Sequence, residues 1–330
     1  MSSRYLITGA TGFVGGHIAE AFVQRGWPVS AVVRPTSDTA LLKKLNVNLL
    51  VGELSDPRFV ASAVADAEVV VHAAAKVGDW GPVEDYRAAN VDQLRVLLEA
   101  CKGQALSRFI HVSSLGVYEG RHHYGSDETV PPPAQHSDGY TQSKVESEQL
   151  ALKYHNDFGV PVVVLRPGFV YGPRDRTVLP KIIENLRNHQ IRYPGGGNAA
   201  MNTIFIGNFV QAVFLALDNA EAVGQIYNLT DGEFVSKRRF IESICDALGL
   251  DKPTGKPPLW LAKLVTRFSE WRARRRGATE APKFTFAKLK FIAYNLDFSI
   301  EKAKRELGYL PRYTFQEGMY ETMAYYQQNS

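Results

Sequence analysis

Tyr140 and Lys144 are separated by three residues in the segment YTQSK. On a helix this spacing places both side chains on one face, about one turn apart. A free tyrosine has a pKa of about 10 and is a poor acid or base at neutral pH. A nearby ammonium stabilises the phenolate and lowers that pKa. The pair predicts acid–base chemistry at Tyr140, although a surface pair with this spacing also arises by chance.

Two serines, Ser113 and Ser114, follow an apolar run upstream of this pair, and residues 109–113 are expected to form a strand. Ligands of an open α/β sheet bind outside the carboxyl ends of its strands. A serine in that place can hydrogen-bond a substrate oxygen. A simple turn at the strand end is the alternative interpretation, and it applies most readily to Ser113.

The segment TGATGFVG, residues 8–15, joins an apolar run to an amphipathic stretch. Strand, glycine-rich turn and helix together are typical of a site for a dinucleotide pyrophosphate. Gly9 permits the tight turn, Gly12 keeps a side chain away from the phosphates, and Gly15 lets the helix approach the strand. The N–H groups at the helix start then face the anion. The residues of this predicted site are Gly9, Thr11, Gly12, Phe13, Val14 and Gly15.

Short β-rich runs alternate with helical patterns through the first half of the chain. This alternation predicts an α/β fold with a Rossmann-type, doubly wound parallel sheet. Continuous Val, Ile and Leu residues suit strands that are covered on both faces. The expected strands are 4–8, 29–33, 47–51, 69–72, 109–113, 162–166 and 226–229, and the expected helices are 13–25, 57–65, 83–101 and 140–158.

The alternation of β-rich and helical runs becomes irregular after residue 166, where Pro-Gly, Gly-Pro and PGGGN segments indicate loops. We expect a dinucleotide-binding domain over residues 1–170, to which residues 201–229 return. Residues 171–200 and 230–330 are expected to form a smaller, mostly helical lobe that carries the substrate site.

The composition of the 330 residues is ordinary for a soluble globular protein, with 45% hydrophobic and 22% charged residues. A net charge of +4 argues against a general nucleic-acid binder. Cys101 and Cys245 lie in apolar helical patterns, and two cysteines cannot make a disulfide framework. With no visible signal peptide or bilayer-spanning run, we expect a reducing, cytoplasmic setting. No residues have metal-ligand spacing, and a homodimer is left open.

Taken together, four motifs resemble those of the extended short-chain dehydrogenases/reductases. They are TGATGFVG at residues 8–15, VSS followed by VY at 112–118, YTQSK at 140–144 and RPGFVYGP at 166–173. The resemblance runs from about residue 4 to residue 325 and therefore covers nearly the whole chain. It implies the same two-lobed fold and an NAD(P)-dependent oxidoreductase that needs no metal.

The resemblance also implies roles for individual residues. Tyr140 would be the catalytic acid–base, and Lys144 would hold the nicotinamide ribose and lower the pKa of Tyr140. Ser114 would polarise the substrate oxygen, and it is preferred over Ser113 because of its spacing to Tyr118. Further residues that would line the cofactor cleft are Ala73, Ala74, Ala75, Asn90, Pro167, Phe169 and Val170.

The residues after the second strand bear on the choice of nicotinamide cofactor. NAD-binding folds place an acidic residue there to hold the ribose 2′-OH. This chain has Arg34, whose guanidinium can bind a 2′-phosphate, and Ser37 can add a hydrogen bond. We therefore expect NADP in preference to NAD; an arginine that only stacks on adenine would accept either. Glu53 and Leu54 resemble the adenine-contacting pair of the family.

Two substrate classes compete. Nucleotide-sugar epimerases and dehydratases of the superfamily usually carry an Arg-Asp pair before the late strand, and this chain has Met201-Asn202 there. They also usually carry an acidic residue at the position of Asn208. At these positions the chain more closely resembles the branch of 3β-hydroxysteroid and sterol-4α-carboxylate dehydrogenases. We therefore expect a small hydrophobic substrate, steroid-like or long-chain. A non-catalytic NADP-binding protein is a further alternative, but such members typically lose the tyrosine or the lysine.

The segment Leu259–Arg276 combines an apolar helical pattern, including two tryptophans, with six basic residues and one acidic residue. Ordinary lobe core with a solvated charged edge explains such a pattern. Contact with a membrane surface, or cover over a lipid entrance, is the alternative. The expected setting is accordingly cytoplasmic, with peripheral membrane contact through this segment left open.

Overall fold

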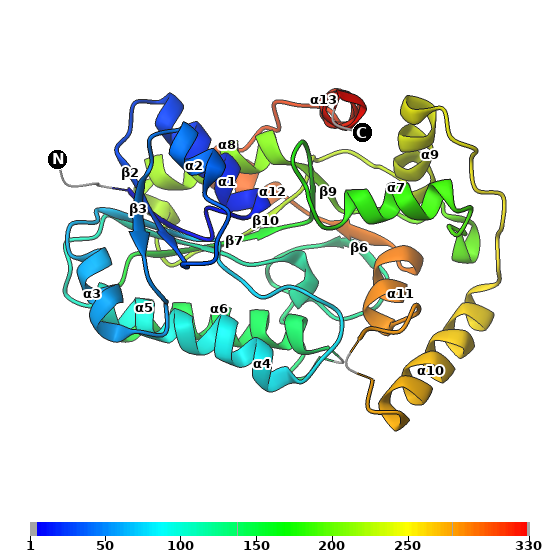
Figure 1. The fold of residues 1–330 in the computed structure, drawn as a ribbon, viewed down its shortest axis with the longest axis horizontal. Helices are drawn as coiled ribbons and strands as arrows, with labels where there is room; N and C mark the ends of the chain where they lie inside the picture. The colour runs from blue at the N-terminus through cyan, green and yellow to red at the C-terminus, as the bar shows by residue number, and fades with distance from the viewer. Residues whose placement is uncertain (1–4, 137, 279, 329–330) are drawn as a thin grey trace.

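The computed structural model describes residues 5–136, 138–278 and 280–328, and a seven-stranded parallel sheet forms its centre (Figure 1). The strand order is β10-β7-β5-β4-β1-β2-β3. All seven expected strands are present, with ends shifted by at most one residue within the described part. They are β1 (Tyr5–Thr8), β2 (Val29–Val33), β3 (Asn48–Val51), β4 (Val69–His72), β5 (Arg108–Val112), β7 (Val162–Pro167) and β10 (Ile226–Leu229).

Helices cover both faces of this sheet, which is why its central strands carry apolar residues without alternation. Figure 1 shows one helical layer above the sheet and one below it. The upper layer contains α1 (Phe13–Gln24), α2 (Ala40–Lys44), α8 (Ile206–Asp218) and α12 (Glu301–Leu307). The lower layer contains α3 (Pro57–Val64), α5 (Gln93–Cys101) and α6 (Gly139–Phe158). Each layer encloses its own hydrophobic core against the sheet, as a doubly wound fold requires.

The strand order reverses between β1 and β4, and this is the point at which open α/β sheets bind ligands. The chain runs from β1 toward β2 and β3 on one side, and from β4 toward β5, β7 and β10 on the other. The carboxyl ends of β1, β4 and β5 therefore meet at one place on the edge of the sheet.

The expected helix over residues 83–101 is interrupted. It consists of α4 (Val83–Arg87), a π-helical turn η1 (Ala88–Asp92) and α5. Such π-helical turns are rare and occur frequently at functional sites. A hydrophobic periodicity cannot reveal one extra residue in a single turn, so the sequence predicted one continuous helix.

The second half of the chain forms a mostly helical lobe beside the sheet, as expected. Its helices are α7 (Leu179–Arg187), α9 (Lys237–Leu248), α10 (Leu259–Arg275), α11 (Phe286–Ala293) and α13 (Phe315–Gln328), with the short turn η3 (Pro194–Gly196). The turn η4 (Ala220–Ala222) connects α8 to β10 in the central layers. Two small parallel sheets join β8 (Phe169–Tyr171) to β9 (Thr203–Phe205) and β6 (His123–Ser126) to β11 (Leu296–Phe298). Of residues 201–229, α8 and β10 rejoin the central layers, whereas β9 pairs with β8 outside the main sheet.

Candidate active site

Gly9 and Gly15 have no room for a side chain in the turn after β1. Gly9 has a φ of +74°, and a Cβ there would lie 2.5 Å from the backbone nitrogen of Ala74. A Cβ on Gly15 would collide with the carbonyl oxygen of Gly9. The predicted roles of both glycines are confirmed: one permits the turn and its approach to the segment after β4, and the other lets α1 pack against the turn.

The N-terminus of α1 is available to an anion. Its N-cap is Gly12, which has no side chain to accept hydrogen bonds from the first turn. By contrast, Asp56 and Asp138 accept such bonds at the starts of α3 and α6. Thr11 and Gly12 are exposed, whereas Phe13 and Val14 pack partly against the core. Free N–H groups beside a turn without side chains fit the pyrophosphate of a dinucleotide.

The residues expected near the adenosine half of the cofactor lie at the same edge of the sheet. Arg34 is exposed just after β2, and the Ser37 hydroxyl accepts a hydrogen bond of 3.2 Å from the Arg34 backbone nitrogen. Glu53 is exposed after β3, but Leu54 is buried in the core below the sheet. The side chain of Leu54 therefore serves the core, and contact with adenine would have to come from its neighbours.

Ser114 and Tyr140 meet at the carboxyl end of β5. Ser114 ends the extended segment and caps the short turn η2 (Leu115–Val117), accepting a hydrogen bond of 2.9 Å from the backbone nitrogen of Gly116. Tyr140 lies in the first turn of α6, which Asp138 caps by accepting from Thr141 at 2.8 Å. The cap fixes the start of the helix, and the phenol of Tyr140 lies near enough to the Ser114 hydroxyl to be influenced by it.

Lys144 lies one turn further along α6, with its side chain buried. Its Nζ donates a hydrogen bond of 2.8 Å to the carbonyl oxygen of Val112, the last residue of β5. Burial lowers the pKa of Lys144 to about 8, while the carboxylate of Glu148 acts in the opposite direction. Two of the three ammonium protons are left for other partners.

The pKa of Tyr140 differs from the expectation. Burial, with a smaller effect from the negative charge of Asp138, raises it to about 12, and the neighbouring hydroxyl of Ser114 acts in the opposite direction. The prediction that Lys144 lowers this pKa is wrong for this structure, because loss of solvent dominates and the ammonium is bound to Val112. Tyr140 is therefore a protonated phenol at neutral pH, which is the form that can deliver a proton.

The choice between the two serines is decided by a buried carboxylate. The hydroxyl of Ser113 donates to Glu148 and points away from Tyr140 into the interior. Arg166 on β7 donates two hydrogen bonds to the same carboxylate, from Nε at 3.0 Å and from a second nitrogen at 2.6 Å. Both side chains are about 3% exposed. Ser113 is thus committed to the interior, which leaves Ser114 as the candidate for contact with a substrate.

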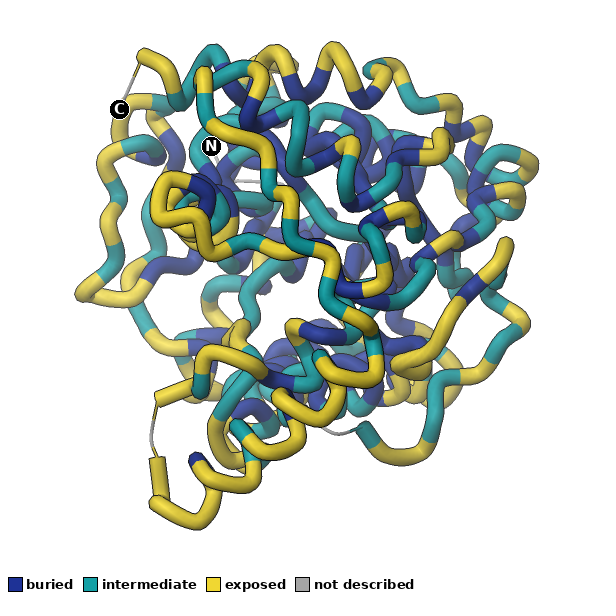
Figure 2. The backbone as a smooth tube through the Cα atoms, turned by 90° about the vertical axis from the view of Figure 1, so that its right-hand side faces the viewer, coloured by how far each residue is buried: buried dark blue, intermediate teal, exposed yellow. Residues whose placement is uncertain are grey.

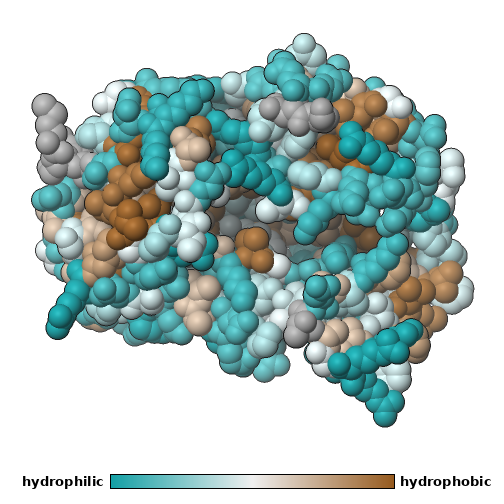
Figure 3. All heavy atoms as spheres, in the orientation of Figure 1, coloured by the Kyte–Doolittle hydropathy of each residue, from teal (hydrophilic) through white to brown (hydrophobic). Residues whose placement is uncertain are grey.

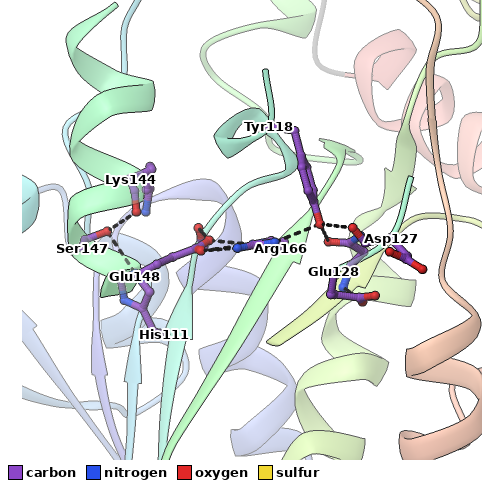
Figure 4. A network of polar contacts seen from close by, with 10 residues as sticks. His111, Tyr118, Asp127, Glu128, Lys144, Ser147, Glu148 and Arg166 are labelled. Carbon is purple, nitrogen blue, oxygen red and sulfur yellow. Dashed lines mark hydrogen bonds and ion pairs between the residues drawn. The ribbon is translucent and has the colours of Figure 1, made fainter. Parts of the chain in front are cut away.

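The ion pair continues into a polar network behind the site, shown in Figure 4. A nitrogen of Arg166 donates to the hydroxyl oxygen of Tyr118 at 2.9 Å, and Tyr118 contacts Asn228 on β10 at 3.0 Å. The sequence analysis missed this network. Two features of the sequence could have indicated it: an arginine inside an otherwise apolar strand, and Glu148 four residues after Lys144, because a buried charge requires a partner.

Asn90 is buried in the π-helical turn and holds two segments together. Its side-chain oxygen accepts from the backbone nitrogen of Lys76 at 2.7 Å, and its nitrogen donates to the Ser143 hydroxyl at 2.8 Å. It thereby joins α6 to the loop that follows Ala73, Ala74 and Ala75. The three alanines are half-buried beside the glycine turn, where their small side chains leave the cleft open.

The nicotinamide end of the expected site is formed by the segment after β7. Pro167 ends that strand, and Phe169 and Val170 are half-buried in β8. The ring of Phe169 lies 5.0 Å from that of Phe291 on α11, so the two lobes meet here through aromatic side chains. Figure 3 shows the surface hollowed near the middle of the molecule, with hydrophobic side chains along parts of the rim.

Lys290 is a second residue that the sequence analysis missed. It extends from α11 and donates hydrogen bonds to the carbonyl oxygens of Gly116 and Tyr118, at 2.7 and 2.8 Å. Burial lowers its pKa to about 8. The lysine ties the helical lobe to the chain segment directly after Ser114. No local pattern could reveal this contact, because the partners are more than 170 residues apart.

Met201 and Asn208, the positions used in the sequence analysis to distinguish the two substrate classes, have a structural role. Met201 is buried, and Asn208 donates to Asp231 and to the carbonyl oxygen of Tyr313, each at 2.8 Å. Asn208 also accepts from the backbone nitrogen of Tyr313 at 2.9 Å. It ties α8 to the C-terminal segment and does not face the cleft.

The NAD dependent epimerase/dehydratase family matches residues 5–230 of the chain. The 4-hydroxy-2-methyl-3-oxo-4-farnesyl-3,4-dihydroquinoline-1-oxide ketoreductase of Stigmatella aurantiaca is 30% identical over 319 residues, covering 96% of this chain and 94% of the relative. The 3-beta-hydroxysteroid dehydrogenase of Mycolicibacterium neoaurum is 29% identical, covering 98% and 91%. The crystal structure of gox2253 superposes with a TM-score of 0.82 at 30% identity, covering 100% and 99%.

The chain belongs to the NAD dependent epimerase/dehydratase family, as its motifs predict. It is an NAD(P)-dependent dehydrogenase/reductase of the extended short-chain type. Within the described part of the chain, no helix combines the length and the apolar character that crossing a bilayer demands.

Proposed function

We propose that the protein is an NADP-preferring oxidoreductase that interconverts a hydroxyl and a ketone on a hydrophobic, steroid-like or long-chain substrate. The observation that carries this proposal is that the hydroxyl groups of Ser114 and Tyr140 lie close together at the carboxyl end of β5. In the reductive direction, the two hydroxyl groups converge on one substrate oxygen. Ser114 stabilises the charge that develops on that oxygen, and Tyr140 transfers its proton to it.

Lys144 positions the cofactor beside this pair. The ammonium is held by Val112 and has two further protons, with which it would bind the ribose of the nicotinamide. The bound cofactor supplies the hydride that is exchanged with the substrate carbon. Once the cofactor is near, the positive charge of Lys144 also favours the phenolate that remains after Tyr140 has given up its proton.

The preference for NADP rests on Arg34. Its side chain is exposed at the end of β2, next to the start of α1. A guanidinium binds a phosphate through paired, charge-assisted hydrogen bonds, whereas an acidic residue would repel it. Ser37 closes the same turn and brings a hydroxyl into reach.

The hydrophobic substrate is supported by the walls between the lobes. Phe169 and Phe291 are in contact there, and both are half-buried. The position of the Arg-Asp pair of the sugar-nucleotide enzymes is occupied by the buried Met201 and by Asn202. The farnesylated substrate named for one relative and the steroid named for another agree with such walls.

A substrate panel tests the proposal. The wild-type protein is incubated with NADPH or NADH and with a 3-keto steroid, a long-chain β-keto acid or a UDP-sugar, and with the corresponding alcohols in the oxidative direction. We expect absorbance changes at the nicotinamide band for a lipid ketone or alcohol, faster with the phosphorylated cofactor. Tyr140→Phe measures the background.

The panel also separates the alternatives. Interconversion of a UDP-sugar without turnover of any lipid would show a nucleotide-sugar epimerase or dehydratase. Tight NADP binding without turnover of any member in either direction would favour a non-catalytic binding protein.

A further inference from the structure

We infer that the outer face of α10 docks the protein on an anionic lipid bilayer. The helix is 17 residues long, and its amphipathic pattern is inverted with respect to a helix that packs into a core. Its inward side carries small residues, of which Thr266 and Ala273 are buried. Its large apolar side chains point outward and are between 41% and 64% exposed; they are Trp260, Leu261, Leu264, Val265, Phe268 and Trp271.

Few parts of the protein cover this helix. Within the described residues, α10 packs mainly against α11 and the short turn η3, and Glu270 on its inward side accepts a hydrogen bond of 2.7 Å from the Phe286 backbone nitrogen. Figure 2 shows that most residues of α10, at the edge of the molecule, are exposed. Figure 3 shows a hydrophobic patch over the helix, with hydrophilic residues at its far end. Contiguous apolar surface of this kind marks an interaction site.

Positive charge borders the apolar face. Lys263, Arg267 and Arg274 follow helical spacing along one side of it, and Arg272, Arg275 and Arg276 close its C-terminal end. The segment Leu259–Arg276 carries six basic residues and one acidic residue, a net +5, so the rest of the chain, from a total of +4, has a net charge of −1. The net positive charge of the chain thus comes from this segment.

These two properties together select a lipid surface as the occupant. Interfacial helices place tryptophan, phenylalanine and leucine into the boundary between headgroups and acyl chains, with basic residues among anionic headgroups. Two copies of this chain paired symmetrically through the same face would instead bring both basic borders together. Charge complementarity therefore favours an anionic bilayer over a second copy.

The helix lies next to the cleft. The indole nitrogen of Trp80 donates to the carbonyl oxygen of Ala278, just after α10, at 2.9 Å, and the Arg274 guanidinium lies 5.6 Å above the Trp80 ring. Trp80 belongs to the loop that follows the cleft alanines, and α11 reaches the segment after Ser114 through Lys290. Docking would therefore bring the mouth of the cleft close to the bilayer. If the proposed function holds, a lipid-dissolved substrate would have a short path to it.

Vesicle binding tests the inference without substrate or cofactor, so its outcome does not depend on the proposed function. We expect the wild type to cosediment with vesicles of phosphatidylcholine and phosphatidylserine at low salt, and much less with phosphatidylcholine alone or at high salt. Lipids brominated in their acyl chains should quench tryptophan fluorescence, because Trp260 and Trp271 are two of the four tryptophans.

Two variants and a control sharpen the test. Replacing Arg267, Arg272 and Arg276 with glutamine should lower the partition coefficient by roughly 100-fold, since each basic residue near the surface contributes about a factor of five. Leu264→Gln with Phe268→Gln should abolish quenching. The control replaces Lys43, Lys44 and Arg58, exposed on α2 and α3, with glutamine, which removes the same charge elsewhere.

Three outcomes would overturn the inference. They are no binding of the folded wild type to anionic vesicles at low salt, equal loss of binding in the control variant, and a wild-type dimer that Leu264→Gln with Phe268→Gln converts to a monomer. The last result would assign the face to a second copy of the chain. Circular dichroism establishes that each variant is folded.

Discussion

The hydroxyl groups of Ser114 and Tyr140, which come from different elements, lie close together at the carboxyl end of β5. Ser114 is held there by its bond to the Gly116 nitrogen, and Tyr140 by the capped start of α6. Both hydroxyl groups are therefore positioned before any ligand arrives. Preorganised donors of this kind stabilise developing charge more effectively than groups that must reorient.

Tyr140→Phe should abolish turnover and leave cofactor affinity nearly unchanged. The substitution keeps the aromatic ring and removes the only atom that can carry the proton. Initial rates and NADPH titration by fluorescence measure the two effects. If the variant kept most of its kcat, proton transfer by Tyr140 would be ruled out.

Ser114→Ala should lower kcat by about 10²–10³, the usual effect of losing one donor to a developing oxyanion. Ser113→Ala is the matched control, because Ser113 is directed to Glu148 in the interior. It should reduce stability more than it reduces kcat. A large loss of kcat in Ser113→Ala with little in Ser114→Ala would reverse the assignment.

The affinity for cofactor should fall as the pH rises above 8. In the free protein the pKa of Lys144 is about 8, lowered by burial, so the ammonium is charged below this pH and neutral above it. If binding requires the ammonium, the Kd for NADPH should be flat below pH 8 and rise about tenfold per pH unit above it. Lys144→Arg should bind more weakly but with a flat profile, because a guanidinium stays protonated. A wild-type Kd that is constant from pH 7 to pH 10 would contradict this role of Lys144.

Arg34→Asp should shift the ratio of NADP to NAD affinity by roughly 10- to 100-fold toward NAD, as expected when a charge-assisted hydrogen bond to the 2′-phosphate is lost. The new carboxylate also accepts a bond from a free 2′-OH. Titrations with both cofactors give the ratio. Equal affinity of the wild type for both would limit Arg34 to contact with adenine.

Arg166→Met should lower the free energy of unfolding by about 3–5 kcal/mol, because it leaves the buried carboxylate of Glu148 without its partner. Arg176→Met is the control. Its ion pair with Asp38 is solvent-exposed, and such pairs contribute about 0–1 kcal/mol. Urea unfolding compares the two variants, and similar small losses in both would show that the buried pair is not a stabilising element of the site.

The sequence by itself determined the architecture and named the candidate residues of the site. Runs of β-branched residues predicted the seven strands, and the glycine turn predicted the pyrophosphate end, because both depend on neighbours in the chain. Tyr140 and Lys144 were predicted for the same reason, since four residues on a helix define one face. The strand end indicated both Ser113 and Ser114, and the resemblance to the family favoured Ser114 through its spacing to Tyr118.

Only the tertiary structure decided the properties that depend on distant parts of the chain. The pKa of Tyr140 is raised because packing removes water, and a local motif carries no information on that burial. The contacts of Ser113 with Glu148 and of Lys290 with Gly116 join residues 35 and 174 positions apart. The outward direction of the apolar side chains on α10 likewise depends on which face its neighbours cover. Hydrophobic periodicity identifies a helix and its faces, but what covers each face follows from the arrangement of the whole chain.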